Sequence, residues 1–416
     1  MIVDGLRPGS SAPGGAPSPA TILLACLRAP DTVRGLCAHP EIDWPRVVAE
    51  AGLHRVVSLT LEALQRSGAV AAGHVPTAVL AELKRQRRHQ VGLTVRLDAA
   101  LAEILATLAT RGVPVIVLKG VTLARLYPAL ASRPRSDLDL LIDPADWPRA
   151  ENTLVRMGYQ LLEAAHVRRP LLSPRQSPED RQYYRARDGL LVELHADYLG
   201  SGLRRPADRA VWRRARTAGI AGLAVPIPML SPGDTFLHVT THLQRHAYTR
   251  LLWFYDLWLL LRAEGALIPW DEVARQAERA GVKAAAYYGI SYAEALFGPI
   301  APPRARAALR PGVLRRRLHE GMWPRRRILS LDVDLIPALE TLQQAHQLPP
   351  AVFDAYDPPG RMLVHLLLSG DVWPKALILA RRFLPAEEWL RHYGPAQVRR
   401  YRARLLLARL LARLAA

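Results

Sequence analysis

The sequence of 416 residues contains only two cysteines, Cys26 and Cys37. Two cysteines without metal-ligand spacing exclude a disulfide framework and a cysteine-based zinc site, which favours a reducing compartment, the cytoplasm. Residues 1–20 lack the basic and apolar segments of a signal peptide and predict a disordered Pro/Gly/Ser-rich leader. The longest strongly apolar run, residues 251–261, contains Asp256 and is too short to span a bilayer. We therefore expect a soluble cytoplasmic protein without a transmembrane segment.

Acidic residues are scarce as well, because 37 of them face 56 basic ones and the formal net charge is +19. Such a charge attracts polyanions non-specifically and is compatible with phosphate-bearing substrates. Only four of the basic residues are lysines, and arginine and alanine abundance of this kind is typical of a GC-rich genome. The arginines are also dispersed in short clusters. A dedicated nucleic-acid partner is therefore disfavoured, although it stays open.

Hydrophobic periodicity divides the chain after the leader into three segments. Residues 21–110 repeat apolar positions at helical spacing and predict an N-terminal helical region. Residues 111–200 predict a compact unit of strand, helix, strand, helix and hairpin. Residues 201–416 predict helices again, and the clearest of them opens at Ser231 as its N-cap. The expected fold class is α+β, with a small mixed sheet flanked by N- and C-terminal helical regions.

Two acids stand in the stretch SRPRSDLDLLID (residues 132–143), where Asp137 and Asp139 alternate in an otherwise buried strand. Alternate residues of a strand lie on one face, so two like charges would be held a few ångströms apart. Acids near strand ends are often solvated or paired with arginine, and Arg133 and Arg135 are close enough for that. The other explanation is a bound divalent cation.

A third acid lies in a later strand of the same unit. The stretch LLVELHA alternates so that Glu193 and His195 share one face and apolar residues the other. If this strand lies beside the first, three carboxylates converge, and Mg²⁺ or Mn²⁺ would compensate their repulsion. Upstream, VLKG ends a strand and starts a helix. Lys119 and Gly120 therefore occupy a turn where N–H groups, a helix dipole and an ammonium group favour a phosphate.

The stretch VLKGVTLARLYPALASRPRSDLDLLI, followed by LVELHADY, resembles the uncharacterised bacterial nucleotidyltransferase family of the DNA polymerase β-like superfamily. The likeness extends over the flanking helical segments, from about residue 21 to residue 394. It implies a polymerase β-like core that transfers a nucleoside monophosphate from a nucleoside triphosphate, such as ATP, with two-metal chemistry. The acceptor is a hydroxyl or phosphate of a peptide, a sugar or a small molecule, and these residues do not specify which.

Carried over position by position, the resemblance makes Asp137 and Asp139 metal ligands and Glu193 the third ligand or the base towards the acceptor. The residues that it assigns to the nucleotide are Lys119, Gly120, Thr122, Arg133 and Ser136. The Lys-Gly turn departs from the Gly-Ser turn usual in the superfamily, and Thr122 would supply the hydroxyl; Arg133 equally fits a structural ion pair. Two alternatives stay open. The altered turn favours a catalytically degenerate nucleotide-binding regulatory protein, and the many arginines are compatible with an RNA-modifying nucleotidyltransferase.

Three further polar residues are candidates for lining the cleft. These are His195, His242 and Asp256, for which ordinary packing or, for Asp256, a buried pair with arginine or histidine is the structural alternative. His242 lies between His238 and His246, which recur every four residues on one helix face. The three histidines lack the additional ligands that a zinc site needs, so we interpret them as packing or cleft-lining residues.

Three local expectations concern structure alone. Asp143 is expected to be the N-cap of the following helix rather than a fourth metal ligand. Asp188 and Gly189 are expected to form the two-residue turn of a hairpin. Residues 397–416 alternate leucines with arginines and predict an amphipathic terminal helix that packs on the protein rather than on a membrane surface.

Overall fold

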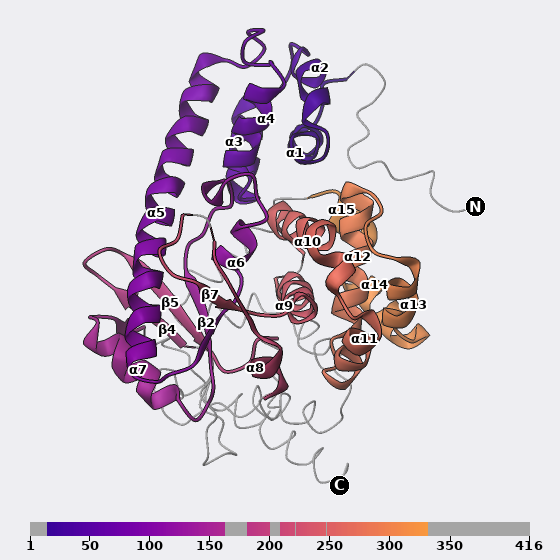
Figure 1. Ribbon diagram of the computed structural model, residues 1–416. Coiled ribbons are helices and arrows are strands. Elements are labelled where there is room, and N and C mark those ends of the chain that lie inside the picture. Colours follow the sequence, from indigo (N-terminus) through magenta and orange to yellow (C-terminus); the bar gives the residue numbers. More distant parts are fainter. Residues whose placement is uncertain (1–14, 163–180, 200–208, 221, 247, 332–416) are drawn as a thin grey trace, which may run out of the picture.

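A seven-stranded mixed sheet lies beside two groups of helices in the computed structural model (Figure 1). The structure describes residues 15–162, 181–199, 209–220, 222–246 and 248–331. The expected leader therefore lies mostly outside the described residues, and a helix already begins at Pro19. The expected terminal helix lies wholly outside them. The mixed α+β class is confirmed.

The described helices form three groups along the chain. The N-terminal helices are α1 (Pro19–Arg28), α2 (Val33–Cys37), α3 (Trp44–Leu53), α4 (Val57–Arg66) and α5 (Thr77–Thr110). The helices around the sheet are α6 (Val121–Ala124), α7 (Trp147–Arg156) and α8 (Ala210–Arg214). The C-terminal helices are α9 (Pro232–Arg245), α10 (Leu251–Glu264), α11 (Trp270–Arg279), α12 (Lys283–Phe297), α13 (Pro303–Leu309), α14 (Val313–Met322) and α15 (Arg325–Leu329).

The strands are β1 (Val115–Val117), β2 (Leu138–Ile142), β3 (Gln160–Leu161), β4 (Arg181–Arg185), β5 (Leu190–His195), β6 (Arg216–Ala218) and β7 (Ile227–Met229). Their order in the sheet is β3-β4-β5-β2-β1-β7-β6. Strands β6 and β7 come from the segment after residue 200, for which only helices were predicted. That prediction is wrong for these strands, because three residues are too few to show an alternating pattern.

The two faces of the sheet pack against different layers. Leu138, Leu140 and Ile142 of β2 join a hydrophobic cluster with α7 and the second half of α5. Leu141 joins the other cluster, which contains α9, α10 and the N-terminal helices. Side chains alternate along a strand, so Asp139 shares the face of Leu141. The long helix α5 contributes to both clusters and connects the N-terminal helices to the sheet (Figure 1).

The start of α7 differs from the prediction. The helix begins at Trp147 with Asp146 in the N-cap position, so Asp143 is not its cap. Asp143 follows the last residue of β2 directly, and the chain needs a turn before the helix can begin. Its Oδ1 atom accepts a hydrogen bond from the backbone N–H of Ala145 at 2.9 Å and stabilises that turn.

The predicted β4–β5 hairpin is confirmed, but the prediction of a two-residue turn is wrong. Arg185 pairs with Leu190, so residues 186–189 form the connection. The Arg185 guanidinium pairs with the Asp188 carboxylate (Nη2–Oδ2 2.8 Å) across this loop. Gly189 closes the loop with φ 70°, a conformation that favours glycine. A side-chain contact therefore favours the longer connection.

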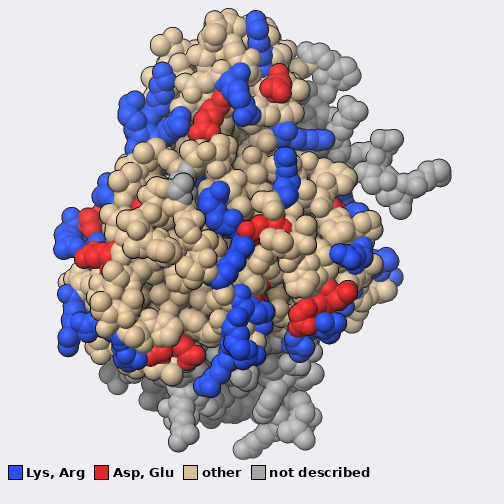
Figure 2. Space-filling model, in the orientation of Figure 1, with Lys and Arg blue, Asp and Glu red and all other residues tan. Residues whose placement is uncertain are grey.

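The surface carries its basic residues in separate groups. On the face drawn in Figure 2, several groups of arginine and lysine adjoin acidic side chains. Exposed ion pairs also join basic to acidic side chains, as in Arg85–Glu82 (2.6 Å) and Arg275–Glu272 (2.8 Å). In the part of the chain that the structure describes, no helix is both long and apolar enough to cross a membrane.

Two buried histidines from other parts of the chain form hydrogen bonds with residues 248–251, where the connection after α9 leads into α10. His54 accepts the backbone N–H of Leu251 on Nδ1 at 3.3 Å, and His319 Nε2 lies 3.0 Å from the Tyr248 hydroxyl. Burial lowers the pKa of His54 to about 4 and the pKa of His319 to about 3. A histidine in the unfolded chain titrates near pH 6.5, so below that pH the unfolded state binds more protons than the folded state.

Acid should therefore begin to destabilise the protein near pH 6, before the carboxylates start to titrate. We expect the free energy of unfolding to fall by about 1.4 kcal/mol per pH unit for each such histidine as the pH decreases from 6 to 4. Urea unfolding at several pH values measures this slope. The variant His319→Gln keeps an acceptor for Tyr248 and should reduce the slope by one proton. An unchanged slope in the variant would contradict the assignment.

Candidate active site

Asp139 and Glu193 lie side by side because their strands pair in parallel. In the register of β2 and β5, Asp139 is opposite Glu193 and Leu141 is opposite His195. Adjacent strands are separated by about 4.8 Å, so carboxylates on one face of paired positions are close neighbours. The expectation that these two strands are neighbours is confirmed. Asp137 comes one residue before β2.

A buried ion cluster is centred on Asp139, whose side chain is 1% exposed. Its Oδ1 atom accepts a hydrogen bond from Lys119 Nζ at 2.6 Å and lies 3.0 Å from His195 Nε2. The same His195 nitrogen is 3.5 Å from Glu193 Oε2. Gln182 on β4 donates a hydrogen bond to the other oxygen of Glu193. Potential ligand atoms of Asp139, Glu193 and His195 all lie within 4.8 Å of one another.

Positive charge compensates the acids of this cluster. Burial would raise the pKa of Asp139, but the Lys119 ammonium and the His195 hydrogen bond hold it well below its usual range. Burial and the charges of Asp139 and Asp137 raise the pKa of Glu193. Burial opposes the charge of Lys119, yet the three carboxylates outweigh burial and raise its pKa. The ion pair of Asp139 with Lys119 is thus charged at neutral pH.

Two nearby arginines pair with other acids. Arg133 donates from Nε and Nη2 to the two oxygens of Asp256, at 2.6 and 2.7 Å. Arg135 donates to both oxygens of Asp98, at 2.5 and 2.9 Å. The alternative in which these arginines neutralise the acids at positions 137 and 139 is therefore wrong. The expectation that Asp256 is a buried acid paired with arginine is confirmed.

The turn after β1 has a conformation that requires glycine. Gly120 adopts φ 85° and ψ −110°, and its carbonyl accepts a hydrogen bond from Arg133 Nη1 at 3.3 Å. Thr122 donates its hydroxyl to the Leu118 carbonyl at 2.5 Å. The following helix α6 has only four residues, so the predicted helix is shorter than expected and its dipole contributes little. Lys119 points to Asp139 instead of standing free in the turn.

The N-terminal region reaches the acidic strand through Arg55. This residue lies between α3 and α4 with φ 59°, which is rare for a residue other than glycine. Its Nη1 atom donates to Ser136 Oγ at 3.1 Å, and the Ser136 hydroxyl donates to Asp137 Oδ1 at 3.3 Å. Sequence reasoning missed Arg55 because nothing in its local sequence distinguishes it from the many other arginines.

The histidine row is formed by His238 and His242 on α9 and by His246, the residue at the C-cap of this helix. His238 donates from Nδ1 to a backbone carbonyl at position 198, while the rings of His242 and His246 contact Trp253 with centroids 4.9 and 4.8 Å away. Burial and the Lys119 charge lower the pKa of His238 to about 4. Among the described residues, none of the row belongs to the group of potential metal ligands. The ring contacts with Trp253 are packing contacts, and a cleft-lining role of His242 stays a prediction.

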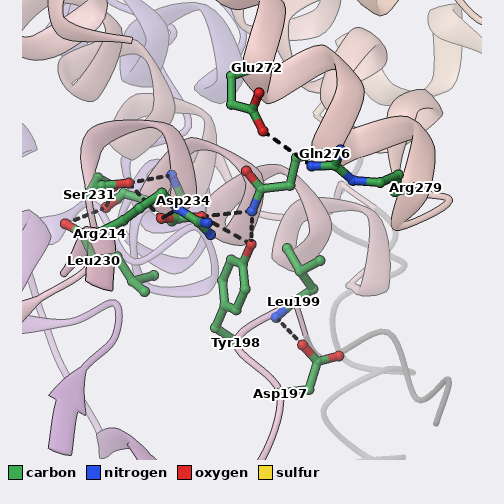
Figure 3. A network of polar contacts seen from close by, with 11 residues as sticks. Asp197, Tyr198, Leu199, Arg214, Leu230, Ser231, Asp234, Glu272, Gln276 and Arg279 are labelled. Carbon is green, nitrogen blue, oxygen red and sulfur yellow. Dashed lines mark hydrogen bonds and ion pairs between the residues drawn. The ribbon is translucent and has the colours of Figure 1, made fainter. Parts of the chain in front are cut away.

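The chain beyond β5 is held by a buried network around Asp234 (Figure 3). Arg214 donates to both oxygens of Asp234 at 2.8 Å, and Gln276 donates at 2.8 Å. Ser231 donates at 2.6 Å and caps α9, as predicted. Tyr198 donates its hydroxyl at 3.1 Å, and its carbonyl accepts from the histidine row. The network therefore sets the position of α9 relative to β5 and the acids.

The cluster offers donors that fit a divalent cation. The Oδ2 atom of Asp139 is buried and has no hydrogen-bond partner among the described residues. An unpartnered buried carboxylate oxygen is unfavourable, so a ligand role would satisfy it. Glu193 and His195 supply the neighbouring donors, and the carboxylates are the ligand type that Mg²⁺ and Mn²⁺ accept. Asp137 does not belong to this close group, and its role as a ligand stays a prediction.

One family model matches the part of the chain that contains the sheet strands and the acidic cluster. The family described as uncharacterised nucleotidyltransferase matches residues 40–298, which is more than half of the 416 residues. The matched range includes both acidic strands, the turn at Gly120 and the histidine row. No curated protein matches the chain.

Proposed function

Since the chain belongs to the uncharacterised nucleotidyltransferase family, we propose that it transfers a nucleoside monophosphate from a nucleoside triphosphate, such as ATP, to an acceptor hydroxyl or phosphate. The observation that carries this proposal is the adjacency of Asp139 and Glu193 across paired strands, with one buried oxygen of Asp139 unpartnered. The proposal includes a polymerase β-like core, a bacterial cytoplasmic location and an acceptor that is a peptide, a sugar or a small molecule.

The reaction would proceed by in-line displacement. An acceptor oxygen attacks the α-phosphorus, the bond from that phosphorus to the oxygen bridging to the β-phosphate breaks, and pyrophosphate leaves. Asp137 and Asp139 would hold Mg²⁺ or Mn²⁺, with Glu193 as the third ligand or as the base that receives the acceptor proton. The cations supply charge neutralisation for the triphosphate. Positioning by the protein accounts for most of the remaining catalysis.

The nucleotide would contact the turn after β1 and the start of β2. Lys119, Gly120, Thr122 and Ser136 are the residues that we assign to it. Arg133 acts on the same turn through the Gly120 carbonyl, since its other nitrogens are bonded to Asp256. His195 and His242 are proposed to face the acceptor side of the site.

One observation favours a second candidate function, a nucleotide-binding regulatory protein without transfer activity. The ammonium group of Lys119 is bonded to Asp139 at 2.6 Å, and the helix after the turn has only four residues. Both features weaken phosphate binding compared with a longer helix and a free lysine. Metal-dependent nucleotide binding without release of pyrophosphate would identify this function.

The proposal is tested with nucleoside triphosphates labelled separately at the α- and γ-phosphates. The purified protein, Mn²⁺ or Mg²⁺ and a cell extract are incubated, and the labelled acceptor is isolated. We expect label to be transferred from the α-position only, with stoichiometric pyrophosphate, and to be lost in Glu193→Gln. The exposed Glu272→Gln serves as the matched control and should transfer normally. Transfer of the γ-label, or full activity in Glu193→Gln, would contradict the proposal.

A further inference from the structure

His195 brings a nitrogen donor into a cluster that sequence reasoning treated as carboxylates alone. Its Nε2 atom lies 3.0 Å from Asp139 Oδ1 and 3.5 Å from Glu193 Oε2. A cation bound about 2.1 Å from each ligand holds adjacent ligand atoms roughly 3.0–3.4 Å apart. The first separation lies in this range and the second is slightly longer, and all three potential ligand atoms lie within 4.8 Å of one another. Small side-chain shifts would therefore place the three ligands around one ion, which would replace the direct hydrogen bond of His195 to Asp139.

The surroundings of His195 fix this arrangement. The residue is 6% exposed and is the last of β5, directly opposite Leu141 in the register with β2. It shares the face of Glu193 because the two residues alternate along the strand. The unpartnered Oδ2 atom of Asp139 is a further donor at the same place. The backbone of two paired strands therefore positions all three ligands.

We propose that Asp139, Glu193 and His195 form a metal centre with mixed oxygen and nitrogen ligands that selects a first-row transition dication, such as Mn²⁺ or Co²⁺, over Mg²⁺. The inference rests on the proposed function in one respect, because it takes this metal centre to be the site of nucleotidyl transfer. Mg²⁺ strongly prefers oxygen ligands and keeps much of its water, whereas imidazole binds transition dications and follows their affinity order. His195 is then a direct determinant of metal selectivity.

Metal binding to the full chain without nucleotide tests this inference. Calorimetric titration with Mg²⁺, Mn²⁺ and Co²⁺ gives the three affinities, and pulsed electron paramagnetic resonance of bound Mn²⁺ detects a directly coordinated nitrogen. In the wild type we expect the nitrogen coupling and a preference for Mn²⁺ and Co²⁺. In His195→Asn the coupling should vanish, and affinity for Mn²⁺ and Co²⁺ should fall by at least about 10-fold while Mg²⁺ affinity changes much less.

Two controls separate the alternatives. His246→Asn removes an imidazole outside the ligand group and should keep both the coupling and the selectivity. His195→Gln provides a second replacement of the same residue, and circular dichroism verifies that each variant is folded. Nitrogen coupling that persists in both His195 variants, or equal loss of Mg²⁺ and Mn²⁺ affinity, would overturn the inference. Either outcome would contradict only the ligand role of His195 and would say nothing against nucleotidyl transfer by the wild type. Absence of label transfer in a wild type with the expected metal selectivity would instead contradict only the proposed function.

Discussion

Asp137→Asn is expected to reduce nucleotidyl transfer by about 10³-fold or more while the protein remains folded. The substitution keeps the shape of the side chain and removes the negative charge that a cation and the triphosphate would require. Asp137 is only half-buried, and its contact with the Ser136 hydroxyl, 3.3 Å long, can also be made by an amide oxygen. The thermal midpoint should therefore change by no more than about 2 °C.

The measurement compares α-label transfer by the variant with that of the wild type under saturating Mn²⁺. Asp143→Asn is the matched control, because it is the same substitution at the other end of the same strand. Asparagine can still accept the Ala145 N–H that Asp143 accepts at 2.9 Å, so this variant should be fully active. Near wild-type transfer by Asp137→Asn would show that Asp137 is not a metal ligand.

Arg133→Met is expected to cost about 3–5 kcal/mol of unfolding free energy. The substitution leaves the Asp256 carboxylate, which is 2% exposed, without the guanidinium that bonds both of its oxygens. It also removes the donor to the Gly120 carbonyl, so the turn after β1 loses support. Urea unfolding measures the loss. The same substitution in the exposed Arg275–Glu272 pair, Arg275→Met, should cost less than about 1 kcal/mol.

A second variant separates stability from nucleotide binding. Arg133→Met combined with Asp256→Leu removes both charges and should regain part of the lost stability, although the Tyr127 hydroxyl then loses its acceptor at 2.7 Å. Arg133 is used in an ion pair and reaches the nucleotide turn only through the Gly120 carbonyl, so we expect the double variant to bind a nucleoside triphosphate with an affinity within about 10-fold of the wild type. A double variant that is stable but no longer binds nucleotide would instead assign Arg133 to the phosphates.

Local sequence patterns predicted much of the architecture. Helical periodicity indicated the N-terminal helices, and alternation indicated the strands that carry Asp139 and Glu193. The predictions that were wrong also have local causes. Strands β6 and β7 are too short for a pattern, the loop after β4 is set by the Arg185–Asp188 pair, and the turn at Asp143 delays α7. Element type was thus more predictable than element boundaries.

The partners of the acidic cluster were not predictable in the same way. Arg133 and Asp256 are 123 positions apart, and their pairing depends on how α10 packs beside the turn after β1. Lys119 and Asp139 are only 20 positions apart, but their contact requires β1 and β2 to be neighbours. Arg55 reaches Ser136 from another helical region altogether. No local pattern encodes such pairs.

The sequence by itself determined the α+β class, the two acidic strands and the face on which each acid lies, because alternation and helical periodicity are local properties of the chain. Only the tertiary structure decided which charges meet. It paired Asp139 with Lys119 and His195, and it directed Arg133 and Arg135 to other acids. The physical reason is that burial makes an uncompensated charge costly, and the compensating group is whichever one the packing of distant elements brings within a few ångströms.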